Sequence, residues 1–138
     1  MMNRQSISDL LQSHGVLPTP QRVEIAMAML DSFQHLSADQ VLAKVNENGS
    51  PVSKATVYNT LGLFAERGLI REVIVDPARV FYDSRTSPHY HFYNVDEGTL
   101  MDFDAAALPL SAIPKIPEGM ISEGVDVIVR VRNKPATL

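Results

Sequence analysis

The chain has 138 residues, of which 45% are hydrophobic and 20% charged, with a formal net charge of −4 and no cysteine. This composition excludes a disordered chain, and the lack of cysteine excludes disulfides, thiolate zinc sites and thiol catalysis. No apolar run approaches the roughly 18 residues that span a bilayer, and the N-terminus has no signal-peptide core. We therefore expect a cytoplasmic protein with no membrane partner.

Charge is distributed unevenly along the chain. Residues 1–82 hold seven Lys/Arg and eight Asp/Glu, a net charge of −1, whereas residues 83–138 hold five and eight, a net charge of −3. Any nucleic acid bound by the first part would therefore be held by a local cluster of groups rather than by the overall field.

Two helices are expected first. Ile7, Leu10 and Leu11 form a short apolar face that ends at His14-Gly15. Thr19-Pro20 then has the pattern of an N-cap followed by proline at the first helical position. The residues behind it are predicted to be buried: Val23, Ile25, Ala26, Met27, Met29 and Leu30.

Two further helices carry clear N-terminal signals. Ser37 and Gln40 match a capping box, and the helix behind them is expected to end at Asn48-Gly49. Ser53 is expected to cap a fourth helix, which Gly68 is placed to end in the left-handed conformation. The apolar face of this fourth helix comprises Val57, Leu61 and Phe64.

Strand-like runs at residues 69–75 and 79–83 flank a turn at residues 76–78. A pair of capped helices followed by a hairpin is the order of a winged helix-turn-helix, whose second helix would enter the DNA major groove. We therefore expect residues 1–82 to form a winged-helix DNA-binding domain.

The remaining residues have a different pattern. Residues 83–88 are a polar connector and an expected hinge, and strand-like segments follow at residues 89–95, 99–103 and 125–132. Residues 107–119 hold three prolines and predict an irregular crossover. About fifty residues with three strands bury little surface alone, so residues 89–138 are expected to pair with a second copy of the chain. The whole is predicted to be an α+β fold that begins with a winged helix.

Histidines mark a candidate metal site. His89 and His91 lie two positions apart, so a strand would present both on one face, and a hairpin could bring Asp102 beside His91. Asp83 lies near enough to join them if the connector folds back. Imidazole with carboxylate suits Fe(II), Mn(II) or Zn(II). The same pattern also occurs on exposed strands that bind no ion, and local sequence alone favours a turn at His35.

The segments TPQR at residues 19–22, HLSADQ at 35–40 and ATVYNTL at 55–61 resemble the ferric uptake regulator superfamily of bacterial transcription factors. The resemblance extends over residues 7–133, and the missing cysteines, the YNT motif and the tail at 117–132 are most similar to the iron response regulator branch. It implies a homodimer that binds operator DNA, in which residues 89–138 form a small α/β dimerisation and metal-sensing domain.

The resemblance also assigns residues. It implies one regulatory metal site per subunit, similar to that of the peroxide-sensing branch, at His35, Asp83, His89, His91 and Asp102. It implies DNA contacts at Arg22, Ser53, Thr56, Tyr58 and Asn59. Lys54, near the start of the expected recognition helix, is either a further DNA contact or a solvated surface residue.

Three departures from the family pattern follow. Asn94 and Glu97 stand where many members have a first CxxC pair, so we expect no structural zinc of the kind that cysteine thiolates hold. Iron response regulators often bind haem at three consecutive histidines, where this chain has His89-Tyr90-His91, so haem stays open as a ligand. Leu17 replaces the Lys or Arg of relatives that reaches the minor groove.

Three functions fit these residues to different degrees. The leading hypothesis is a dimeric, metal-dependent transcriptional regulator of iron or peroxide homeostasis and not an enzyme. An iron enzyme with a 2-His-1-carboxylate site at His89, His91 and Asp102 would need an enclosing barrel that the chain is too short to supply. The third is a metal-free DNA-binding module with structural histidines.

Overall fold

A computed structural model describes residues 2–47 and 51–136 of the chain. It divides into two compact units, Met1–Thr86 and Ser87–Leu138, here called unit 1 and unit 2. Among the described residues, no helix is long and apolar enough to cross a membrane. The expected helix end at Asn48-Gly49 lies outside the described residues.

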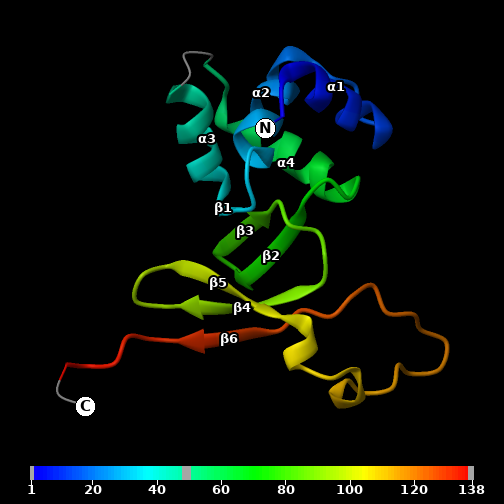
Figure 1. Ribbon diagram of the computed structural model, residues 1–138, viewed down its shortest axis with the longest axis vertical. Coiled ribbons are helices and arrows are strands. Elements are labelled where there is room, and N and C mark those ends of the chain that lie inside the picture. The colour runs from blue at the N-terminus through cyan, green and yellow to red at the C-terminus, as the bar shows by residue number, and fades with distance from the viewer. Residues whose placement is uncertain (1, 48–50, 137–138) are drawn as a thin grey trace. The chain divides into compact units, whose positions relative to one another are not determined.

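Unit 1 begins with four helices (Figure 1), and each starts or ends at the predicted signals. The helix bounds are α1, Arg4–Ser13; α2, Pro20–Leu30; α3, Ala38–Glu47; and α4, Lys54–Glu66. The Thr19 and Ser53 side chains accept hydrogen bonds from the N–H groups of Arg22 and Thr56. Ser37 and Gln40 form the predicted reciprocal capping box. Local chemistry thus defines the helix starts.

The core of unit 1 lies between these helices. Ile7 and Leu11 of α1 and Ile25 and Met29 of α2 are fully buried, as is Phe64 of α4. Helices α1 and α4 end at the predicted glycines, with Gly15 and Gly68 at φ of 74° and 78°. These φ values are unfavourable for residues with a Cβ, which is why glycine terminates both helices.

A three-stranded antiparallel sheet in the order β1-β3-β2 completes unit 1. Strands β2 (Arg71–Asp76) and β3 (Arg79–Asp83) form the predicted wing hairpin. Strand β1 is only His35–Leu36, and the local prediction of a turn at His35 was wrong there. Two residues leave no alternating pattern, so this strand is created by its pairing with β3 rather than by local propensity.

Unit 2 contains a second sheet in the order β5-β4-β6. Strand β4 (His89–Asn94) pairs antiparallel with β5 (Thr99–Asp104) and parallel with β6 (Ile128–Val131). The segment between β5 and β6 is irregular apart from two short 3-10 turns, Ala105–Ala107 and Leu110–Ala112. The alternating valines predicted a strand from residue 125, but β6 begins only at Ile128.

Four polar residues link the β4–β5 turn to the end of β6. The Asn94 amide Nδ2 donates to Glu97 Oε2 at 2.9 Å and to Asn133 Oδ1 at 2.8 Å. Asn94 Oδ1 accepts from the Asp96 and Glu97 N–H groups, and Asp96 Oδ2 accepts from the Asn133 N–H. This set, here called the Asn94 clasp, occupies the position where the family resemblance places a CxxC pair.

Candidate metal centre and DNA-binding surface

The sheet of unit 2 brings three potential ligands together. His89 and His91 alternate onto the same face of β4, and Asp102 of β5 lies directly opposite His91 in the register. Asp102 Oδ1 lies 3.6 Å from His89 Nε2 and 3.5 Å from His91 Nε2. Each of the three residues offers a ligand atom within 4.8 Å of the others. The predicted convergence of this trio is therefore present within unit 2.

Ring orientation favours coordination through the Nε2 atoms. His89 Nδ1 lies 2.7 Å from the Ser87 carbonyl oxygen, to which a protonated Nδ1 donates. That hydrogen bond leaves Nε2 unprotonated in the neutral ring, the form that binds a metal. Both histidines are buried, whereas the Asp102 side chain is 28% exposed.

Unit 1 holds a second, smaller set. His35 of β1 is the register partner of Asp83 of β3, and His35 Nε2 lies 3.3 Å from Asp83 Oδ2. Asp83 is buried, with 1% of its surface exposed, and its Oδ1 accepts the Arg85 N–H at 2.9 Å. This pair exists only because β1 docks on β3, so spacing along the sequence gives no sign of it.

Ligand separations test whether these sets fit an ion. Metal–ligand bonds of about 2.1 Å place tetrahedral ligands about 3.4 Å apart and adjacent octahedral ligands about 3.0 Å apart. The nitrogen–oxygen separations of 3.3–3.6 Å in the two sets match the tetrahedral value and lie slightly above the octahedral one. The donor set of imidazole and carboxylate, without thiolate, suits Mn(II), Fe(II) or Zn(II).

The predicted DNA contacts all lie in unit 1: Arg22 is in the first turn of α2, and the others cap α4 or lie in its first two turns. Arg22, Thr56 and Asn59 line a cavity of about 260 Å³ together with Thr19, Gln21 and Thr60. Tyr58 is exposed, and the Lys54 ammonium lies 5.7 Å from the centre of its ring. Lys54 also pairs with Asp39 at 3.3 Å, although both side chains are largely exposed.

Two of these residues have structural roles as well. The Ser53 hydroxyl caps α4 and lies 2.8 Å from Thr56 Oγ1. Arg22 donates to the Leu17 carbonyl at 3.0 Å, while the Leu17 side chain is exposed. Helix capping thus accounts for Ser53 without any ligand, whereas Tyr58 and Asn59 are exposed on the face of a helix.

Four helices with a β-wing, followed by a small sheet that bears imidazole and carboxylate groups, define a winged-helix protein with metal-binding capacity. The model of the ferric uptake regulator family matches residues 13–116. The chain belongs to this family.

Relatives and solved structures agree with this assignment. The peroxide operon regulator of Bacillus subtilis is 36% identical over 95 residues, which are 69% of this chain and 66% of that protein. The ferric uptake regulator of Pseudomonas aeruginosa with manganese has a TM-score of 0.73 at 27% identity, covering 93% of this chain and 98% of that one. The Francisella tularensis regulator with iron has a TM-score of 0.67 at 28% identity, covering 84% and 90%. Membership of the iron response regulator branch stays a prediction.

Proposed function

We propose that the protein is a metal-dependent, dimeric, DNA-binding regulator of transcription that acts in the cytoplasm in iron or peroxide homeostasis. The observation that carries this proposal is the pair of convergent histidine–aspartate sets, each built on a sheet of a different unit. Family membership and similarity to peroxide and ferric uptake regulators support it.

The two sets are proposed to hold one divalent ion together. Asp83 and His89 are separated by six Cα steps, which limits the distance between their Cα atoms to about 20 Å. An ion that gained His35 and Asp83 in addition to His89, His91 and Asp102 would fix the connector between the units. When bound, the metal would supply the positive charge that holds these five side chains together in one centre.

Unit 1 is proposed to bind operator DNA through α4. Tyr58 and Asn59 would read base edges, while Arg22, Ser53, Lys54 and Thr56 would contact phosphates. Because unit 1 is nearly neutral, attraction to phosphate is weak and the relative placement of two recognition helices must supply much of the affinity. A metal that fixes this placement therefore controls DNA binding.

The test compares the double variant His89→Ala/His91→Ala with His14→Ala, a control at the remaining histidine outside the proposed set. DNA selected from a random pool by the Mn(II)-loaded protein serves as the probe, titrated with and without Mn(II). The proposal expects one Mn(II) per chain and metal-dependent DNA binding for the wild type and His14→Ala only. Unchanged stoichiometry and DNA affinity in the double variant would refute the metal switch and favour a metal-free module.

The iron-enzyme alternative has no structural support. Its ligands would require an enclosed substrate cavity, whereas the described part of unit 2 forms a single sheet of three strands. Asp102 is partly exposed at the edge of that sheet, in β5. The ferric uptake regulator family consists of transcription regulators rather than enzymes.

A further inference from the structure

His35 lies on a strand of two residues, which is too short to fix the position of a side chain by itself. Strand β1 has only two register partners, Asp83 and Tyr82. A ligand must be held within about 0.5 Å of its productive position to bind an ion well. Other groups must therefore hold this segment in place.

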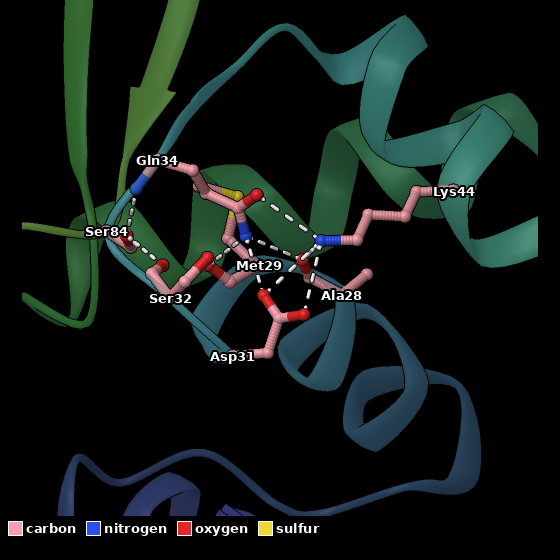
Figure 2. Close-up of polar contacts among 7 residues, drawn as sticks. All are labelled: Ala28, Met29, Asp31, Ser32, Gln34, Lys44 and Ser84. Carbon is pink, nitrogen blue, oxygen red and sulfur yellow. Dashed lines mark hydrogen bonds and ion pairs between the residues drawn. The ribbon is translucent and has the colours of Figure 1, made fainter. Parts of the chain in front are cut away.

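Ser84 supplies the first of these groups (Figure 2). The Gln34 N–H donates to Ser84 Oγ at 3.0 Å, and the Ser84 N–H donates to the Gln34 carbonyl at 3.2 Å. The Ser84 hydroxyl in turn donates to the Ser32 carbonyl at 3.0 Å. Since Gln34 precedes His35 and Ser84 follows Asp83, these bonds extend the ladder by one residue pair beside the two ligands.

The Gln34 side chain anchors the same segment to the end of α2. Its Nε2 donates to the carbonyls of Ala28 and Met29 at 2.8 and 2.9 Å and lies 3.1 Å from Asp31 Oδ1. The last carbonyls of a helix have no partner within the helix, so an amide that reaches two of them is strongly oriented. One side chain thus joins α2 to β1.

Lys44 of α3 completes the network. Its Nζ donates to the Ala28 carbonyl at 2.8 Å and to Gln34 Oε1 and Asp31 Oδ1 at 3.3 Å each. Figure 2 shows the Lys44 ammonium approaching the end of α2 from the side opposite to Ser84. A cation is favourable at a helix C-terminus, and here it also offsets the Asp31 carboxylate.

We infer that Gln34 and Lys44 are positioning residues for the metal centre, holding His35 and Asp83 in their paired geometry without touching the ion. This inference rests on the proposed function, because it takes His35 as a ligand. It extends the centre from β1 to the C-terminus of α2 and to α3. Outer partners of metal ligands commonly change affinity 10- to 100-fold when removed, and because Lys44 acts through Gln34 we expect about tenfold for it.

The experiment measures Co(II) affinity of the full chain from the visible absorption of the bound ion. Lys44→Met keeps the aliphatic stem and removes the ammonium, and Gln34→Met removes the amide as a second, independent variant. Lys115→Met, at an exposed lysine of unit 2, controls for the lost charge. Both network variants should raise the Co(II) dissociation constant about tenfold. Lys115→Met should match the wild type, and all measurements are made well below the thermal unfolding midpoint of each metal-free variant.

A double-mutant cycle that combines Lys44→Met with His35→Ala distinguishes a positioning role of Lys44 from a merely structural one. If Lys44 acts through His35, Lys44→Met has no further effect on the dissociation constant once His35 is alanine. Two results would overturn this inference while leaving the proposed ligand set standing. One is a wild-type dissociation constant for both Lys44→Met and Gln34→Met; the other is the same loss of Co(II) affinity on adding Lys44→Met to His35→Ala as to the wild type. If His35→Ala itself leaves Co(II) binding unchanged, the proposed ligand set fails and the inference fails with it.

Discussion

Replacing Asn94 by alanine should loosen unit 2 at the end where β4 and β6 meet. The substitution removes the two donations by Nδ2 and the two acceptances by Oδ1 that form the Asn94 clasp. A net hydrogen bond contributes about 0.5–1.5 kcal/mol, and these bonds are partly exposed, so we take about 0.5 kcal/mol for each. The expected cost of local opening is then about 2 kcal/mol.

Amide exchange of Val95 reports this opening directly. The Val95 N–H donates to the Val131 carbonyl at 2.9 Å, next to the clasp. Since about 1.4 kcal/mol corresponds to a factor of ten, its exchange should become about 30-fold faster in Asn94→Ala. Asn133→Ala provides the matched comparison: it loses one side-chain bond and keeps its N–H donation to Asp96, so about twofold is expected.

The difference in Val95 exchange rate between the two variants tests the role of the clasp more strictly than either rate alone. If Asn94→Ala accelerates Val95 exchange less than about threefold, the clasp does not hold the strand ends together. Equal effects of Asn94→Ala and Asn133→Ala would show that the inter-strand bond alone matters and that the turn bonds of Asn94 contribute nothing.

Three further predictions concern unit 1. Gly68→Ala should lower the unfolding free energy of unit 1 by about 1–2 kcal/mol in denaturant titrations, because Gly68 has a φ of 78°. Its matched control Gly62→Ala lies inside α4 with nothing within 4 Å of the added Cβ, and it should raise that free energy by about 0.5–1 kcal/mol. Ser53→Ala removes the α4 cap and should cost about 1 kcal/mol, with unchanged stability arguing against the capping role. Burial, with a smaller contribution from the Glu72 carboxylate, raises the pKa of Tyr82 above 10.0. The neutral phenol therefore favours the folded state, a contribution that is present below the unfolded-state pKa and lost as the pH rises through the higher folded-state pKa. Tyr82→Phe should therefore flatten the fall of the unfolding free energy with pH on the alkaline side of the unfolded-state pKa.

Local chemistry explains which parts of the fold could be predicted. The starts of α2, α3 and α4 follow from Thr19, Ser37 and Ser53, since a capping side chain acts on N–H groups two or three residues away. Strand β1 could not be predicted, because two residues carry no period and only pairing with β3 extends them. The late start of β6 has the same origin: alternation shows that residues 125–127 can form a strand, not that a partner is present.

The candidate site divides in the same way. A strand period of two places His89 and His91 together, and a hairpin adds Asp102, so spacing predicted that this trio can converge. Only the family resemblance favoured a metal site over histidines that bind no ion. His35 and Asp83 lie far apart in the sequence, and only the family resemblance joined them. Gln34 and Lys44 were missed altogether, because a glutamine before a strand and a lysine on a helix have no distinctive pattern. Only tertiary contacts with the α2 carbonyls reveal them.

Unequal ligand sets suit the two units to different tasks in the proposed switch. Unit 2 offers three potential ligands on paired strands, and in the proposed switch these would hold the ion whether or not unit 1 engages it. In the proposed switch, the added binding energy from His35 and Asp83 would arise only when the ion joins the units, so this difference would shift the conformational equilibrium. Allosteric couplings are typically about 1–3 kcal/mol, a 5- to 150-fold change in affinity.

A ligand pair that had to be ordered on binding would lose part of that energy to entropy. The bonds of Gln34, Lys44 and Ser84 order this pair beforehand, which in the proposed switch would place the sensitivity to metal in unit 1 and the retention of the metal in unit 2.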